Sequence, residues 1–264
     1  MNYVRVLGGL GNQMFQYTMA KYIEASTSSS ITLHLNYFED VKRVPGAVIR
    51  KFDLDKMNTT YLSVYGNLSV GQLINEWDAW SIRPDLDSVY FNGYWQDKKY
   101  YLAVKETIDK DFELKKEYIT DSMVRDAEKM RSSKAVSLHI RRTDYLIESI
   151  TMDDMYYSNA LNILKERVGN DLQVFIFSDD IDYAEGLARR LEIETFCIMP
   201  IREAYQDIYL MSQTMHHVIA NSTFSWWGAV LGNAKNCRGI TVAPKKWFKD
   251  VPAPDIFMDD WFVI

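Results

Sequence analysis

The segment HIRRTDY at 139–145 places two arginines side by side, directly after an apolar run. Guanidinium groups stay charged at physiological pH and present several donors in a rigid fork that matches phosphate and carboxylate oxygens. Arg141 and Arg142 therefore predict an anion-binding site, with phosphate as the natural anion and His139 beside them. A structural ion pair with Asp144 explains either arginine alone equally well.

Two neighbouring carboxylates, Asp179 and Asp180, follow the apolar run LQVFI in the segment FSDD. Adjacent carboxylates repel each other unless donors satisfy at least one of them, and they accept well from the N–H groups of a guanine edge or from ribose hydroxyls. They predict contacts to a nucleotide. Ser178 or Asp179 also suits the N-cap of a helix that begins near Asp182, and both interpretations can hold together.

Hydroxyl side chains gather in the segment ANSTFSWWGAVLG at 220–232, where a helix is expected to follow a short strand. Free N–H groups and the positive end of the helix dipole make such a helix start an anion site. An ordinary Ser or Thr cap, with Trp226 and Trp227 packed in the core, is the alternative. The residues concerned are Asn221, Ser222, Thr223, Phe224 and Ser225.

The segment GGLGNQ at 8–13 is rich in glycine, which permits positive φ and a close approach of the backbone to a ligand. It lacks the G-x-G-x-x-G spacing of dinucleotide-binding turns and the lysine of a phosphate-binding P-loop. Taken alone, it is a weak indication of a site.

Patterns for metal ligation and for serine hydrolysis are missing from the sequence. The histidines show no H-E-x-x-H spacing, and no G-x-S-x-G elbow occurs. The four D-x-D triplets are poor evidence, because about two are expected by chance in a chain with this much aspartate. These patterns therefore give no support for a metal or a cofactor.

From residue 134 onward, short apolar strands alternate strictly with segments of helix length. This alternation predicts an α/β fold with a parallel sheet covered by helices on both faces. Ligands of such sheets bind beyond the carboxyl ends of the strands, where the polar segments above lie. The expected strands are 135–140, 172–178, 194–199, 217–220 and 239–244, and the expected helices are 154–168, 182–191, 202–214 and 224–233.

The N-terminal part is less regular. A strand at 3–7, a glycine turn, a helix over 14–25 and a strand at 31–35 are expected there. Residues 36–100 show only weak helical periodicity, around 69–77. A charged helix over 117–131 ends in serines, so we predict two domains, 1–132 and 133–264.

The composition is that of a globular protein, with 264 residues, 47% apolar and 25% charged. The net charge of −6 and the lack of a basic cluster argue against a nucleic-acid partner. No apolar run approaches the roughly 18 residues of an integral membrane segment. Cys197 and Cys237 lack C-x-x-C spacing, which favours reduced thiols and a cytoplasmic location.

Taken together and in this order, four stretches resemble the motifs of the α-1,2-fucosyltransferases of glycosyltransferase family 11. They are GGLGNQMFQY, HIRRTDY, IFSDD, and NSTFSWWGAVLG followed by APKKWF. The resemblance spans residues 8 to 248, although 36–130 carries little of it. HIRRTDY together with NSTFSWWGA is a specific combination, whereas GGLGNQ or FSDD alone is not.

The resemblance implies a GT-B-type fold, in which two Rossmann-like halves face an active-site cleft. It also implies an inverting, metal-independent galactoside α-1,2-fucosyltransferase. Such an enzyme moves L-fucose from GDP-β-L-fucose to the 2-hydroxyl of a terminal β-galactoside. The N-terminal domain would hold the acceptor, and the C-terminal domain would bind GDP-fucose.

Residue roles carry over from the same resemblance. Arg141 is similar to the arginine that holds the leaving diphosphate, and Asn12 to a residue that faces the sugar and the acceptor; these two are the expected catalytic residues. His139 and Asp180 would lie toward the guanine, with Asp144 in a supporting role. The expected donor-binding residues are Gly11, His139, Arg142, Asp179, Asp180, Asn221, Ser222, Thr223, Phe224 and Ser225.

The same resemblance implies a bacterial enzyme of surface-glycan synthesis, either O-antigen or capsule. Eukaryotic relatives carry an N-terminal membrane anchor, and this chain is expected to lack one. We expect the protein in the cytoplasm. Peripheral association with the inner face of the membrane and a homo-oligomer both stay open, as does the physiological acceptor.

Two other functions fit part of the pattern. One is a GT-B transferase that uses another nucleotide sugar or another acceptor, because contacts to a diphosphate identify neither sugar nor base. The other is a non-catalytic carbohydrate-binding protein with exposed aromatic residues, although core packing explains each aromatic more readily. The aromatics in question are Trp77, Trp80, Tyr94 and Trp95.

The general base is not assigned from the sequence. Asp144 can orient an arginine as readily as it can take a proton. Other carboxylates and a histidine qualify by residue type alone, and a dissociative transition state can dispense with a strong base. The residues that qualify in this way are His34, Glu39, Asp40 and Glu148.

Overall fold

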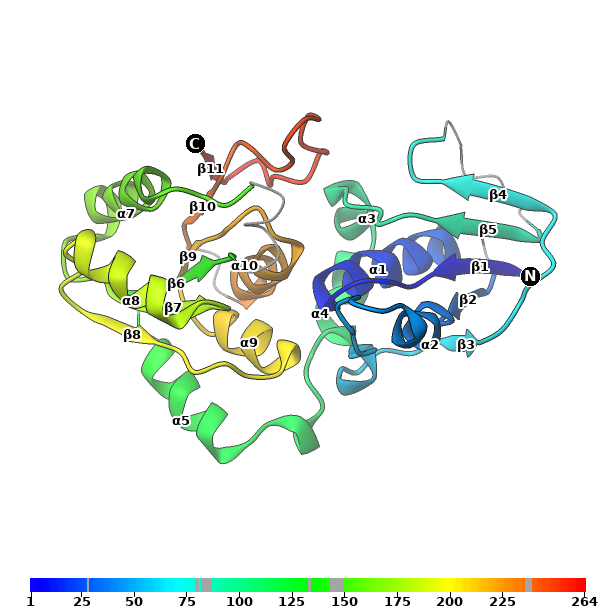
Figure 1. The fold of residues 1–264 in the computed structure, drawn as a ribbon, viewed down its shortest axis with the longest axis horizontal. Coiled ribbons are helices and arrows are strands. Elements are labelled where there is room, and N and C mark those ends of the chain that lie inside the picture. The colour runs from blue at the N-terminus through cyan, green and yellow to red at the C-terminus, as the bar shows by residue number, and fades with distance from the viewer. Residues whose placement is uncertain (28, 79–80, 82–86, 133, 143–149, 236–238) are drawn as a thin grey trace. The chain divides into compact units, whose positions relative to one another are not determined.

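The computed structural model describes residues 1–27, 29–78, 81, 87–132, 134–142, 150–235 and 239–264. The chain divides into two compact units, Met1–Lys115 and Lys116–Ile264 (Figure 1). The predicted boundary at 132/133 lies after helix α5 (Asp121–Met130), whereas this division lies before it. The reason is that α5 packs on the second unit, where Asp126 pairs with Arg202 at 2.5 Å.

The first unit contains a five-stranded sheet in the order β3-β2-β1-β5-β4, with all neighbours parallel. The weak helical periodicity at 69–77 does not correspond to a helix, because β4 is a strand there. The strands are β1 (Asn2–Arg5), β2 (Ile31–His34), β3 (Leu62–Val64), β4 (Gln72–Asn75) and β5 (Val89–Asn92), and the α-helices are α1 (Leu10–Thr27), α2 (Tyr37–Asp40), α3 (Lys98–Ala103) and α4 (Lys105–Asp111).

Helix α1 follows β1 through a tight glycine turn. Gly8 has a φ of +80°, which side chains other than glycine rarely tolerate. The helix then begins at Leu10, earlier than the sequence predicts, so Gly11 and Asn12 lie in its first turn. Met14, Tyr17 and most of the other α1 side chains are buried, which makes α1 a core helix of this unit.

The second unit contains a six-stranded parallel sheet in the order β11-β10-β9-β6-β7-β8. Numbered from β6, this is the 3-2-1-4-5-6 order of doubly wound nucleotide-binding folds. The strands are β6 (Ala135–Ile140), β7 (Gln173–Ser178), β8 (Phe196–Ile198), β9 (His216–Val218), β10 (Thr241–Ala243) and β11 (Phe262–Val263).

Helices connect these strands as the sequence predicts. They are α7 (Asp154–Val168), α8 (Ile181–Arg190), α9 (Ala204–Met211) and α10 (Thr223–Lys235). Every strand and helix predicted from 134 onward is present, with ends that differ by a few residues. Among the described residues from 134 onward, strand β11 is the element that the prediction missed. The predicted α/β fold of GT-B type, with two Rossmann-like halves, is confirmed.

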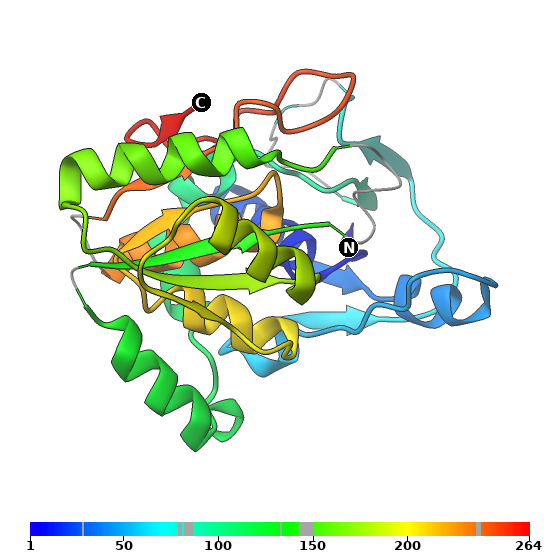
Figure 2. The same ribbon diagram turned by 60° about the vertical axis from the view of Figure 1, so that its left-hand side comes forward.

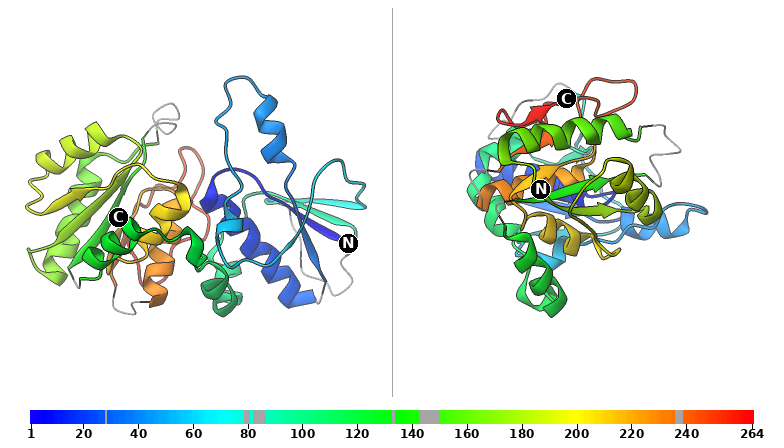
Figure 3. Two further views of the ribbon diagram at one scale, coloured as in Figure 1. Left: turned by 90° about the horizontal axis from the view of Figure 1, so that it is seen from below. Right: turned by 90° about the vertical axis from the view of Figure 1, so that its left-hand side faces the viewer.

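The central strand β6 is buried on both faces, although its residues 136–140 (VSLHI) alternate between apolar and polar types. Val136, Leu138 and Ile140 pack on one face with buried residues of α7 and α8. Ser137 and His139 lie on the other face. Figure 2 shows α7 and α9 on opposite sides of the strands, and Figure 3 shows the same sheet from two further directions.

Helices α9 and α10 pack closely because glycines in α10 leave room. A Cβ at Gly228 would lie 2.8 Å from the Cβ of Met211 in α9. A Cβ at Gly232 would lie 2.6 Å from Nε2 of His217 in β9. The glycines of the segment WWGAVLG therefore set how near α10 lies to α9 and to the sheet.

Candidate functional site

Three of the four predicted polar segments lie at the carboxyl ends of neighbouring strands in the second sheet. HIRR closes β6 and continues beyond it, FSDD closes β7 and leads into α8, and NSTFS follows β9 and opens α10. The strands β9, β6 and β7 are direct neighbours, so their carboxyl ends lie side by side. From β6 the chain adds strands β7 and β8 on one side, and it then adds β9, β10 and β11 on the other side. Ligands of such sheets bind at the point between β6 and β9 where this order changes.

The two arginines are held by the two carboxylates. Nη1 of Arg141 lies 2.9 Å from Oδ2 of Asp179, and the backbone N–H of Arg142 donates to Oδ1 of the same carboxylate at 2.9 Å. Nε of Arg142 donates to Oδ2 of Asp180 at 3.2 Å. The repulsion between adjacent aspartates is thus offset by two fixed cations.

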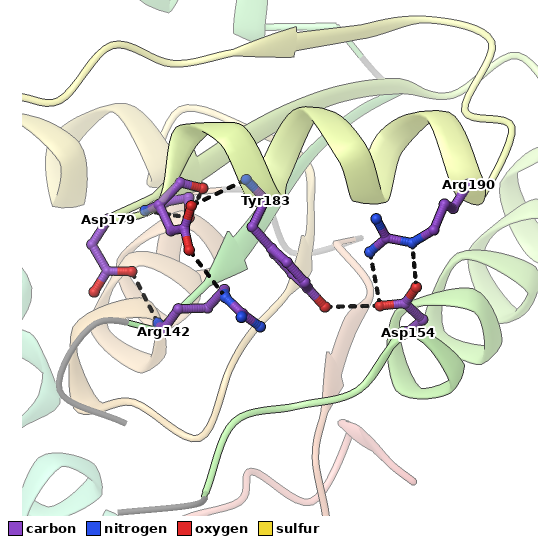
Figure 4. A network of polar contacts seen from close by, with 7 residues as sticks. Arg142, Asp154, Asp179, Tyr183 and Arg190 are labelled. Atoms are coloured by element: carbon purple, nitrogen blue, oxygen red, sulfur yellow. Dashed lines mark hydrogen bonds and ion pairs between the residues drawn. The ribbon is translucent and has the colours of Figure 1, made fainter. Parts of the chain in front are cut away.

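Arg142 also stacks on an aromatic ring that the sequence analysis did not single out. Its guanidinium carbon lies 3.6 Å from the ring centre of Tyr183 in α8. The Tyr183 hydroxyl donates to Asp154 at 2.8 Å, and Asp154 accepts two bonds from Arg190. Figure 4 shows this chain of contacts running from Asp179 along α8 to Arg190.

Asp180 has a structural task in addition to its contact with Arg142. Its Oδ1 accepts from the backbone N–H of Tyr183 at 3.1 Å and so caps α8. The sequence analysis expected a cap in this segment but gave it to Ser178 or Asp179. Both oxygens of Asp180 therefore accept bonds from the chain, and its contact with guanine stays a prediction.

The start of α10 presents hydroxyls and backbone N–H groups. Ser222 Oγ accepts from the backbone N–H of Phe224 at 3.4 Å, and Ser225 Oγ donates to the Ser222 carbonyl at 3.3 Å. The next residue down the helix closes the first full turn, since the Trp226 N–H donates to the Ser222 carbonyl at 3.0 Å. Trp226 and Trp227 are buried, so the hydroxyl cap and the core packing coexist.

Asn221 fixes the loops around this helix start. Its Nδ2 donates to the carbonyls of Ile150 at 3.0 Å and Trp247 at 3.2 Å. The side chain is buried, and it ties two loops to the end of β9. Asn221 is thus a structural residue of the site, and a contact with the donor stays a prediction.

His139 is buried and neutral. Complete burial, with a further contribution from the nearby Arg141, lowers the pKa of His139 to about 3. Its ring centre lies 5.5 Å from that of Phe224. Nδ1 is buried and has no hydrogen-bond partner among the described residues. At neutral pH this ring can offer a neutral donor or acceptor, but no cationic charge.

A second histidine of the same sheet behaves alike. His217 is buried beside Ser137, whose Oγ lies 2.7 Å from Nδ1, and burial lowers the pKa of His217 to about 3. Below the ordinary pKa of 6.5, the unfolded chain takes up protons at His139 and His217 while the folded chain does not.

The contribution of these two histidines to the free energy of unfolding is therefore expected to be fully present above pH 6.5 and to fall as the pH decreases toward 3. Asp207 contributes in the opposite direction, because burial raises its pKa to about 7. Urea titrations of wild type and of His217→Asn at pH values from about 5.5 to 7.5 measure the difference between the two slopes, in a range where exposed carboxylates, with pKa values near 4, stay ionised. His217→Asn keeps a polar group opposite Ser137 and should remove from the slope the one proton that His217 contributes. A slope that does not change in this variant would show that His217 titrates normally in the fold.

Two tyrosines of α7 hold the strand ends that carry the site, and the sequence analysis missed them. The Tyr156 hydroxyl donates to the carbonyl of Ile219 at 2.5 Å, and the Tyr157 hydroxyl donates to the carbonyl of His139 at 3.2 Å. Both rings are buried. Nothing in the local sequence distinguishes them from ordinary core aromatics.

The predicted residues Gly11 and Asn12 belong to the first unit, at the carboxyl end of β1. Asn12 Oδ1 accepts from Nε2 of Gln96 at 3.2 Å. Two buried glutamines of the same motif hold the turn. Gln13 donates to the carbonyls of Gly8 and Lys51, and Gln16 bridges the N–H of Leu7 and the carbonyl of Gly93.

The aromatics considered for sugar binding differ in exposure. Trp95 is buried, so it packs in the core and offers no surface. Trp77 is 77% exposed and Tyr94 is 40% exposed. They follow β4 and β5, whose last residues Asn75 and Asn92 are paired in the sheet. Trp80 lies outside the described residues.

Asp144, Glu148 and Cys237 also lie outside the described residues. Among those that are described, no group of three or more His, Cys, Asp or Glu side chains could hold a metal ion. Metal independence stays a prediction. In the same part of the chain, no helix has the length and apolar character needed to cross a membrane.

Comparison with known proteins identifies relatives over nearly the full length. An α-1,2-colitosyltransferase of Escherichia coli is 32% identical over 271 residues, covering 93% of this chain and 91% of the relative. The O-antigen biosynthesis glycosyltransferase WbnK of Escherichia coli is 26% identical, covering 96% of this chain and 97% of the relative.

Among solved structures, the α-1,6-fucosyltransferase NodZ of Bradyrhizobium is similar in fold. The crystal soaked with GDP-fucose gives a TM-score of 0.53 at 13% identity, covering 87% of this chain and 92% of that chain. The family model described as glycosyl transferase family 11 matches residues 1–264. The chain therefore belongs to glycosyltransferase family 11.

Proposed function

We propose that this family 11 enzyme transfers L-fucose from GDP-β-L-fucose to the 2-hydroxyl of a terminal β-galactoside, with inversion and without a metal. One observation carries the proposal: Arg141 and Arg142 lie together at the carboxyl end of β6, held by Asp179 and Asp180. The name of WbnK supports a role in O-antigen synthesis, and the NodZ structure soaked with GDP-fucose supports the donor.

The chemistry of the transfer explains why cations are needed there. When the bond between fucose and the diphosphate breaks, negative charge develops on the departing GDP and positive character on the sugar. Arg141 supplies a fixed charge at that point, and the N–H groups at the start of α10 add the positive end of a helix dipole. In this scheme the side chains and the backbone neutralise the leaving group.

The neutral His139 fits a position beside the nucleotide. A cationic imidazole next to Arg141 would be repelled, whereas a neutral ring can exchange a hydrogen bond with a base or a ribose. The Phe224 ring beside it offers an apolar surface of the kind on which bases stack. We assign this corner to the guanosine part of the donor.

We assign acceptor binding to the first unit. The exposed rings of Trp77 and Tyr94 follow neighbouring strands, and flat aromatic surfaces of this kind pack against the apolar faces of sugars. Asn12 and Gln96 lie in the same unit, at the end of β1 and after β5. Their amides are suited to hydrogen bonds with hydroxyls.

The donor sugar has a second candidate, because the E. coli relative is named for the transfer of colitose. Colitose corresponds to fucose without the 3-hydroxyl group. A site that donates a hydrogen bond to that hydroxyl discriminates strongly against the deoxy sugar, whereas an apolar site accepts both. Comparing kcat/KM for GDP-fucose and GDP-colitose decides between the two donors.

We expect purified protein to release GDP from GDP-fucose when lactose is supplied, at the same rate in EDTA as with added Mn²⁺. Calorimetric titration should give a GDP affinity at least ~10-fold higher than those for UDP and ADP. Activity that strictly requires Mn²⁺ would refute the metal-independent mechanism. Equal affinity for the three nucleotides would refute a guanine-specific site, and transfer only from a different nucleotide sugar would replace the donor.

A further inference from the structure

We propose that Tyr183 is a positioning residue for the diphosphate site: its ring holds the guanidinium of Arg142 so that the terminal nitrogens face the ligand side. This inference rests on the proposed function, because it assigns Arg142 to the diphosphate of the donor. Neither the family motifs nor the local sequence mark Tyr183, which lies in α8 beyond the FSDD segment.

The contacts of Arg142 involve its backbone N–H, its Nε and one face of the guanidinium, and they leave the two terminal nitrogens available. The backbone N–H and Nε donate to Asp179 and Asp180, and the Tyr183 ring covers one face of the guanidinium at 3.6 Å. Within the part of the chain that the structure describes, neither Nη1 nor Nη2 has a hydrogen-bond partner. These nitrogens carry the donors that suit phosphate oxygens.

Arg141 differs from Arg142 in that one of its terminal nitrogens already pairs with a carboxylate. Its Nη1 pairs with Asp179 at 2.9 Å, so part of its charge is compensated by that carboxylate. Asp180 pairs with Arg142 only through Nε, at 3.2 Å. The two neighbouring arginines are thus arranged differently, and Arg142 is the one whose plane is fixed by stacking.

Tyr183 is itself held at its backbone and at its hydroxyl group. Its backbone N–H donates to Asp180, and its hydroxyl donates to Asp154 at 2.8 Å. Arg190 donates to Asp154 through Nε at 2.6 Å and Nη2 at 3.1 Å, which is a bidentate pair (Figure 4). The hydrogen bond from Arg190 lowers the pKa of Asp154, so this acceptor stays ionised at neutral pH.

This arrangement orders the Arg142 side chain before a diphosphate binds, so binding costs little additional side-chain entropy. A free arginine side chain samples many rotamers, and ordering it upon binding reduces affinity. Stacking on a ring anchored through α7 and α8 orders the guanidinium before the ligand arrives. Arg142 should then bind phosphate oxygens with its two terminal nitrogens, as the planar fork favours.

The test compares Tyr183→Phe with Tyr183→Leu by calorimetric titration of GDP, with guanosine as the ligand that lacks phosphates. Phenylalanine keeps the aromatic face, so we expect GDP to bind within ~3-fold of wild type. Leucine keeps apolar volume without that face, so we expect a loss of ~10-fold for GDP and no change for guanosine. Tyr183 is only partly buried, and thermal unfolding of both variants checks the fold.

A double-mutant cycle shows whether Tyr183 acts through Arg142. In an Arg142→Ala background, Tyr183→Leu should change GDP affinity less than ~2-fold, because the residue it positions is gone. Equal losses in both backgrounds, or an equal loss for guanosine, would assign Tyr183 a purely structural role. Wild-type protein that does not bind GDP would instead refute the proposed function, so the two failures are distinguishable.

Discussion

Arg141→Ala is expected to lower kcat/KM for GDP-fucose by about a hundredfold to a thousandfold while the fold stays intact. In the proposed mechanism, the charge that develops on the departing diphosphate makes its contact with Arg141 stronger in the transition state than in the ground state. Because the side chain lies partly exposed at the end of β6, its removal leaves no buried cavity. The measurement is initial-rate kinetics with lactose, together with the thermal unfolding temperature.

Two further variants separate the charge from the geometry. Arg141→Lys keeps one positive charge but loses the fork, so an intermediate loss of activity is expected. Arg189→Ala serves as the matched control, because Arg189 is an exposed arginine on α8 that pairs only with Glu185 at the surface among described residues. Near wild-type turnover in Arg141→Ala would remove Arg141 from the mechanism.

Gly232→Ala is expected to destabilise the second unit by about 2–3 kcal/mol. The added Cβ would lie 2.6 Å from Nε2 and 2.8 Å from Cε1 of His217. That ring cannot move aside easily, because it is fully buried and its Nδ1 lies 2.7 Å from Ser137 Oγ. Helix α10 must shift away from β9, and its N-terminus at the proposed anion site would shift with it.

Urea denaturation followed by tryptophan fluorescence measures this effect, since Trp226 and Trp227 lie in α10. Gly186→Ala is the matched control in α8, where the nearest atom to an added Cβ is the end of a flexible side chain, Nη1 of Arg190 at 3.0 Å. There the gain in helix propensity should stabilise by up to about 1 kcal/mol. If Gly232→Ala were as stable as wild type, the close packing of α10 on His217 would be wrong.

The sequence was most informative where local pattern and fold agree. Strands and helices from 134 onward were predictable because short segments rich in apolar and β-branched residues alternate with segments long enough to be helices. The polar segments after β6, β7 and β9 could be assigned to one site by the same logic, since parallel strands bring their carboxyl ends to a single edge.

Residues 36–100 resisted prediction because their strands are short and partly exposed. β3 and β4 lie at the two edges of the first sheet, where most of their residues face solvent and the apolar pattern is weak. Helix α5 was predicted correctly as a helix, but its sequence does not state which unit it packs against. The division of the chain and the contact of Asp126 with Arg202 show that it joins the second unit.

The amino-acid sequence by itself determined which residue types stand at the strand ends, because turn positions and helix starts are encoded locally by glycine, serine, asparagine and aspartate. Only the tertiary structure decided what each of them does. Asp179 holds two arginines, Asp180 caps α8, Asn221 ties two loops together, and Tyr183 lies under Arg142. These roles depend on contacts between residues far apart in the chain, which no local pattern specifies.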